Sequence, residues 1–139
     1  MAMNSGRLIS QHHLANGLTL ELWDHCRAVA GYRWFVLLET RIAVPVKEDT
    51  LPPELKLLAN QVVNALWNEI VFSRTEERNF ISLTELPVLL KEMQDRVLKL
   101  APGYFGHPDF AARFIRAKFA ERQELEHWQR LDTRGDSVG

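Results

Sequence analysis

The chain has 139 residues, which is the size of one domain and is long enough to bury a core without disulfides or metals. Hydrophobic residues make up 46% and charged residues 25%, which excludes a disordered or fibrous chain. The formal net charge is -1, so the basic excess that phosphate contacts require is missing, and this disfavours a nucleic-acid-binding protein.

Residues 8–46 predict β structure. The dipeptide Asn16-Gly17 between two apolar runs is typical of a hairpin. A two-residue turn would pair Leu14 with Thr19, whereas a three-residue turn would pair Leu14 with Leu18. The three-residue turn, with Gly17 in the left-handed conformation, is favoured because it gathers larger apolar side chains on one face. That face would hold Leu8, Leu14, Leu18, Leu20 and Leu22, with Ser10 and His12.

A second turn is predicted at 27–31, followed by a long alternating strand. One face of this strand is apolar and consists of Tyr32, Trp34, Val36, Leu38, Ile42, Val44 and Val46, interrupted by Thr40. The other face is mixed and consists of Arg33, Phe35, Leu37, Glu39 and Arg41. This pattern is typical of an antiparallel sheet that is covered on one side.

The rest of the chain predicts helices around one ambiguous stretch. Helical spacing predicts a helix at about 53–68, with Pro53 at its start. Residues 69–82 favour a fourth, charged edge strand, with an extension of the helix as the alternative. Ser82 to Glu85 has the form of a capping box before a helix of about 84–100. A third helix is expected at about 108–131.

We therefore expect an α+β fold with two layers. An antiparallel β-meander of three to four strands would be covered on one face by about three helices. Residues 1–139 would form a single domain, with flexible ends at 1–6 and 133–139.

The first residues lack the apolar segment of a secretion signal, and no run approaches the roughly 20 apolar residues of a membrane span. The sequence therefore predicts a cytoplasmic protein with no membrane partner.

His12, His13 and His25, together with Asp24 and Cys26, are residue types that bind metal ions. Their expected geometry argues against a metal site. In an antiparallel hairpin His25 falls opposite Arg7 or Leu8, roughly 13–17 Å along the strand from His12 and His13. His12 and His13 also point to opposite faces, so we expect no metal site.

Catalytic motifs are missing from the sequence. It contains no phosphate loop, dinucleotide-binding glycine pattern or nucleophile elbow, so no cofactor is expected. The single cysteine, Cys26, excludes an intramolecular disulfide and is interpreted as a small buried hydrophobe.

These features favour a non-enzymatic binding or regulatory domain over an enzyme. Phe35 and Leu37, with Trp23, would form an exposed apolar patch on the second sheet face. We expect this patch to join two copies of the chain in a homodimer.

Two alternatives remain. The first is an enzyme or small-ligand binder with a polar site near the meander end, formed by Asp24, His25, Arg27, Arg33, Glu77 and Arg78. The identity of its small-molecule ligand is not determined by the sequence. The second is an anion- or nucleic-acid-binding surface on the last helix, which carries Arg113, Arg116, Lys118 and Arg122.

Three stretches carry a family resemblance. They are Leu22-Trp23-Asp24-His25 through Arg33-Trp34, Glu77-Arg78-Asn79-Phe80-Ile81, and His107-Pro108-Asp109-Phe110 with Arg113-Phe114-Ile115-Arg116. Together they resemble a family of uncharacterised bacterial proteins over most of the chain. The resemblance implies no activity and no catalytic residue.

Overall fold

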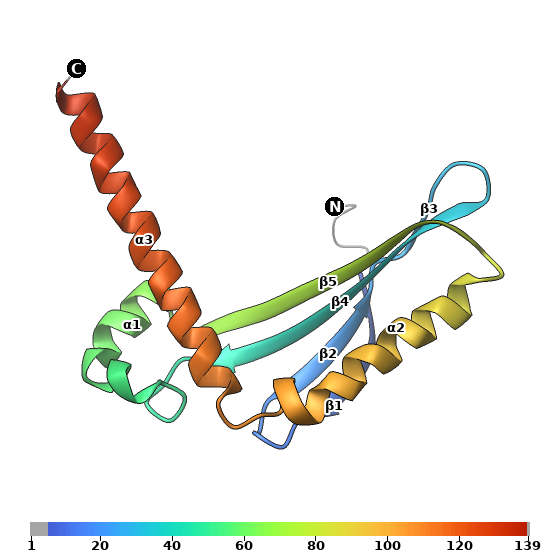
Figure 1. Cartoon of the computed structure of the whole chain (residues 1–139), viewed down its shortest axis with the longest axis horizontal. Helices are drawn as coiled ribbons and strands as arrows, with labels where there is room; N and C mark the ends of the chain where they lie inside the picture. Colours follow the sequence, from blue (N-terminus) through green and yellow to red (C-terminus); the bar gives the residue numbers. More distant parts are fainter. Residues whose placement is uncertain (1–5, 139) are drawn as a thin grey trace. The chain divides into compact units, whose positions relative to one another are not determined.

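The computed structural model describes residues 6–138 and confirms an α+β fold with an antiparallel sheet (Figure 1). Within these residues the sheet has five strands and not the expected three to four, because a two-residue strand forms inside the predicted second turn. The chain forms two compact units. Unit 1 comprises Met1–Ala43 and Val71–Pro108, and unit 2 comprises Val44–Ile70 and Asp109–Gly139. Two of the boundaries between the units fall within strands of the sheet. The expectation of a single domain stays a prediction. The expected flexibility of residues 1–5 and 139 lies outside the described residues.

The first hairpin confirms the three-residue turn. Strand β1 (Arg7–His13) pairs with β2 (Thr19–Asp24), and the Leu14 amide donates to the Leu18 carbonyl at 2.8 Å. Gly17 has a φ of 89°, which glycine adopts without the strain of a Cβ atom. The expected position of Leu8 is wrong, because a bulge between Leu8 and Ser10 places Leu8 opposite Trp23.

Strand β4 (Arg33–Pro45) is the centre of the sheet. It pairs with β2 and with a two-residue strand, β3 (Arg27–Ala28), which lies within the stretch predicted as a turn. The predicted apolar face is buried at Val36, Leu38, Thr40, Ile42 and Val44. The expectation for Tyr32 is wrong, since it sits at the hairpin tip with a φ of 61° and is 95% exposed.

Residues 69–82 form a strand, as predicted, and not a helix extension. Strand β5 (Glu69–Ser82) pairs with β4, and among the described strands it has no other neighbour. Most of its side chains are exposed. A long strand with a charged middle therefore lies at one edge of the sheet.

Helix α2 (Leu86–Leu100) supplies the second layer of unit 1. Just before it, the Glu85 amide donates to the Ser82 hydroxyl, which donates to the Glu85 carboxylate at 2.6 Å, so the two residues of the predicted capping box do bond to each other. The helix begins two residues later than predicted, and its N-cap residue is Glu85, which makes no side-chain cap hydrogen bond. Leu90, Met93 and Val97 are its buried residues. The opposite face is solvated, as an amphipathic helix on a sheet requires.

A π-helical turn, η3 (Ala101–Phe105), ends α2 where the sequence predicted a stop. The ring of Phe105 is buried and contacts Phe72 of β5, with centroids 5.6 Å apart. Asn16 of the first hairpin donates to the carbonyls of Phe105 and His107, at 2.9 Å each. These contacts fasten the end of the helical layer to the sheet.

Unit 2 contains the remaining helices. The predicted helix at 53–68 begins as a 3-10 helix, η2 (Pro53–Leu58), and continues as α1 (Ala59–Leu66). Helix α3 (Phe110–Val138) extends seven residues beyond its predicted end at 131. The unit has an apolar core, made of Leu55, Val62, Leu66, Phe110, Ala111, Ile115 and Phe119. Arg116 and Glu54 join α3 to η2 through a bidentate ion pair.

Candidate functional site

Glu39 is the centre of a polar cluster on the second sheet face of unit 1. Its side chain is only 12% exposed and points away from the buried Leu38 and Thr40. Three donors surround its carboxylate. Arg41 Nη2 lies 2.7 Å from Oε1, His25 Nε2 lies 2.8 Å from Oε1, and the Ser73 hydroxyl donates to Oε2 at 2.6 Å. The cluster therefore joins β4 to β5.

Electrostatics make Glu39 a stabilised anion. Burial raises its pKa, but the hydrogen bonds from Arg41, Ser73 and His25 outweigh burial and lower the pKa to about 2. A carboxylate with so low a pKa is a poor general base near neutral pH. The Ser73 hydroxyl donates to Glu39 and not to His25, so the cluster lacks the order of a serine–histidine–carboxylate triad.

Cations cover two of the three residues predicted to form an interface. The Arg41 guanidinium lies 4.4 Å from the centroid of the Trp23 ring, and that of Arg27 lies 4.9 Å from the centroid of Phe35. The Trp23 indole also donates to Glu21 at 3.0 Å. The three predicted interface residues, Trp23, Phe35 and Leu37, are half-buried. The predicted interface stays a prediction.

Asp24 and Cys26 form a small group beside the cluster. Asp24 pairs with Arg7 at 3.0 Å and accepts from the Cys26 amide at 2.8 Å. Burial raises the pKa of Asp24, but hydrogen bonds from Cys26 and Arg7 outweigh it, so this pKa is lowered overall. Burial and then Asp24 raise the pKa of the Cys26 thiol to about 12. The thiol is therefore protonated and unreactive near neutral pH.

The six residues of the predicted polar ligand site are distributed over several places. Asp24 and His25 belong to the groups just described, and Arg27 covers Phe35. Glu77 is exposed on β5.

Two shallow crevices account for the remaining pair of predicted ligand-site residues. Arg33 lines a crevice of about 340 Å³ with Tyr32 and Trp34, and Arg78 lines another of about 470 Å³ with Ile81 and Val88. Thr84 contributes to both crevices.

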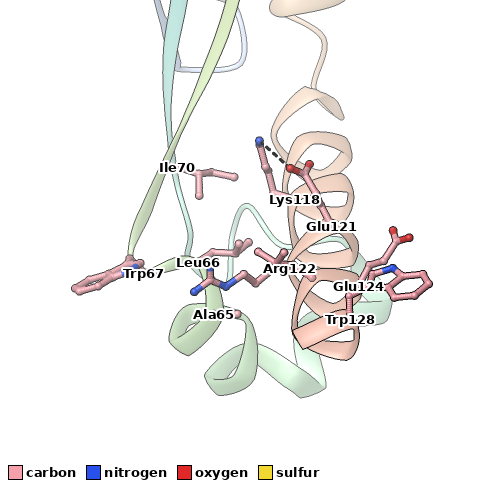
Figure 2. A pocket seen from close by; sticks show the side chains of 10 residues that line it. Ala65, Leu66, Trp67, Ile70, Lys118, Glu121, Arg122, Glu124 and Trp128 are labelled. Carbon is pink, nitrogen blue, oxygen red and sulfur yellow. Dashed lines mark ion pairs between the residues drawn. The ribbon is translucent and has the colours of Figure 1, made fainter. Parts of the chain in front are cut away.

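A cleft of about 530 Å³ in unit 2 lies between the end of α1, the start of β5 and α3 (Figure 2). Its lining is mainly apolar and consists of Ala65, Leu66, Trp67, Ile70, Leu125 and Trp128, with Lys118, Glu121, Arg122 and Glu124. Figure 2 shows Arg122 reaching from α3 towards Leu66. This volume falls within the range of small-molecule sites, which is about 300–1,000 Å³.

Trp67, at one border of the cleft, has a strained backbone. Its φ of 68° and ψ of −163° place it in a region that is accessible essentially only to glycine. Burial of the indole does not offset this strain, since Trp67 is 77% exposed. Strain of this kind persists where the surrounding structure enforces it, and it is frequent at binding sites.

The cations of α3 have acidic neighbours. Arg113 lies 3.9 Å from Asp109, Lys118 lies 3.7 Å from Glu121, and Arg122 lies 3.8 Å from Glu126. Arg116 binds Glu54. Local carboxylates therefore offset the positive charge that an anion- or nucleic-acid-binding surface would need.

Among residues 6–132, whose side chains the structure describes, no group of three or more histidine, cysteine, aspartate or glutamate side chains is arranged to hold a metal ion. Within residues 6–138, no helix has the length and apolar character needed to cross a membrane.

Sequence reasoning missed both the Glu39 cluster and the unit 2 cleft. Alternation placed Glu39 and Arg41 on one face, but Ser73, the third partner of the cluster, lies 34 residues from Glu39. No protein family, curated protein or solved structure matches the chain. The resemblance to a bacterial family therefore stays a prediction.

Proposed function

We propose that this chain is a small, non-enzymatic binding domain that associates with a second copy of itself. The observation that carries the proposal is the outer edge of β5, a strand of 14 residues that pairs only with β4 within the described part of the chain. The amide and carbonyl groups along such an edge are a template for another strand. The second sheet face is a less suitable surface, because a partner there would have to displace Arg27 and Arg41 from the rings they cover.

Sedimentation velocity from 1 to several hundred micromolar tests self-association. We expect a concentration-dependent species of twice the 16.1 kDa monomer mass. A monomer throughout this range would contradict the proposal.

The unit 2 cleft supports a second candidate function, the binding of a small, uncharged apolar molecule. Leu66, Ile70 and Leu125 would contact its apolar part. Lys118 and Arg122 also line the cleft, but Glu121 and Glu124 line it too, so its charges balance and an uncharged ligand fits best.

A native mass spectrum, followed by fluorescence titration, tests the cleft. We expect an added mass on the purified protein, or quenching of tryptophan fluorescence by a brominated medium-chain alcohol. Quenching should weaken in Trp67→Phe and Trp128→Phe, and it should persist in Trp23→Phe, whose ring lies in unit 1. Equal quenching in all three variants would exclude the cleft.

A further inference from the structure

We propose that two copies pair β5 against β5 in antiparallel fashion, with Thr75 of one copy opposite Thr75 of the other. The inference rests on the proposed self-association and adds the surface and the register. The pairing would extend the sheet of one copy into the sheet of the other.

The middle of β5 is accessible for such pairing. Arg74, Thr75 and Glu77 are exposed, and Val71 is 48% exposed. Only β4 pairs with this strand among the described residues. Edge strands of this length usually carry a bulge, a proline, charged side chains or a cover that prevents association. Residues 69–82 contain no proline, and the one positive φ of the strand, 58° at Phe80, lies near its end and outside its middle. The charges of the middle are the protection that this strand does carry, so the register must pair them with opposite charges.

Symmetry limits the possible registers. In a two-fold antiparallel pair the axis passes between two copies of the same residue. Residues equally far before and after that residue then lie opposite one another, on the same face of the sheet. The register is therefore defined by one central residue.

Charge selects the central residue among the candidates in the middle of β5. Centring on Arg74 places arginine opposite arginine, and centring on Glu76 or Glu77 places glutamate opposite glutamate. Like charges directly opposite destabilise a strand pair.

Centring on Thr75 avoids every like-charge pair in the strand. It places Arg74 of each copy opposite Glu76 of the other, and Ser73 opposite Glu77. A threonine pair at the centre is itself a favourable cross-strand contact. The Arg74–Glu76 contact forms twice, so the strand is complementary to itself. Glu76 already lies 3.9 Å from Arg96 of α2, and this arginine would remain its neighbour within each copy.

Cysteine cross-linking tests the register in a Cys26→Ser background. Directly opposed residues have Cβ atoms about 4.5–5.5 Å apart, which a disulfide can join after a small adjustment. We expect Thr75→Cys to form a covalent dimer on mild oxidation. Glu77→Cys is the matched control, because its two copies would be displaced by four residues, roughly 13 Å along the strands. It should cross-link only when mixed with Ser73→Cys, its predicted opposite residue.

A charge exchange tests the same pairing without oxidation. Arg74→Glu and Glu76→Arg should each weaken the homodimer by about tenfold or more, because each variant creates two like-charge contacts. An equimolar mixture of the two variants should recover a heterodimer, since both contacts again join opposite charges. Circular dichroism melting curves verify that each variant is folded.

The outcomes separate this inference from the proposed function. A dimer by mass that fails to cross-link through Thr75→Cys, and that ignores both charge changes, would overturn the β5 register while leaving self-association intact. A wild-type chain that stays monomeric would overturn both. Cross-linking of Glu77→Cys alone would indicate a different register and would also contradict the inference.

Discussion

The Glu39 cluster of unit 1 and the Trp67 cleft of unit 2 use similar residue types for different purposes. In the cluster, arginine, histidine and serine side chains all bind one buried carboxylate, and an arginine covers the neighbouring Trp23. In the cleft, the tryptophans are exposed and one of them has a strained backbone. The cluster satisfies its own polar groups, whereas the cleft leaves contact surface for another molecule.

From this difference, we expect the cluster to stabilise the fold, and the cleft is the region that we propose for binding. Satisfied buried networks contribute to stability, whereas binding sites commonly carry strain that reduces it. Substitutions in the two regions should therefore change the free energy of unfolding in opposite directions.

The largest expected effect is that of Glu39→Gln. The change removes the negative charge between Arg41 and His25 and leaves these two partly buried donors poorly paired. We expect a loss of about 3 kcal/mol in the free energy of unfolding, the order found when one partner of a buried ion pair is removed. Urea denaturation at pH 7 measures it, with the exposed Glu48→Gln as the control. A loss equal to that of the control would show that the cluster does not stabilise unit 1.

The dependence of the free energy of unfolding on pH is a second test of the stabilising role of Glu39. The folded pKa of Glu39 is about 2, below its ordinary value of 4.5. The stabilisation is therefore fully present above about pH 4.5 and is lost as the pH falls towards 2. The loss should be about 2–3 kcal/mol over this interval, because one pKa unit corresponds to about 1.4 kcal/mol. Urea titrations at several pH values should show this dependence in the wild type and a flatter one in Glu39→Gln. Parallel curves would contradict the assignment.

In the cleft, we expect Trp67→Gly to raise the free energy of unfolding. Glycine adopts the backbone conformation of Trp67 without strain, and little burial is lost because the indole is 77% exposed. Relative to Trp67→Ala, which keeps the strain, the glycine variant should be more stable by about 1–2 kcal/mol. Thermal melting of both variants compares them. Equal melting temperatures would mean that the backbone at Trp67 is unstrained.

The smallest effect is expected at an exposed ion pair outside both regions. Lys91 and Asp95 form an (i, i+4) pair on α2 at 3.2 Å, with side chains 76% and 53% exposed. Removing it with Lys91→Ala should change the free energy of unfolding by less than about 0.5 kcal/mol. A larger loss would mean that exposed charges stabilise this fold as strongly as the Glu39 cluster.

Local patterns predicted most of the secondary structure. Alternation identified the buried face of β4, and Asn16-Gly17 identified the first hairpin with its three-residue turn. The prediction of a charged edge strand at residues 69–82 is confirmed by β5. These predictions succeeded because strand periodicity and turn chemistry are properties of neighbouring residues.

The errors occurred where a departure from regular geometry decided the outcome. A bulge moved Leu8 out of the expected register, and a left-handed backbone placed Tyr32 in solvent. The identities of Leu8 and Tyr32 do not indicate these departures, since bulky side chains rarely adopt positive φ.

By itself, the sequence determined the fold class, the buried face of the sheet and the charged edge strand, because each depends on spacing along the chain. Only the tertiary structure decided that Ser73 binds Glu39, that cations cover Trp23 and Phe35, and that Trp67 and Trp128 border one cleft. These groups come from segments far apart in sequence, and their contacts arise only when strand pairing and helix packing bring the segments together.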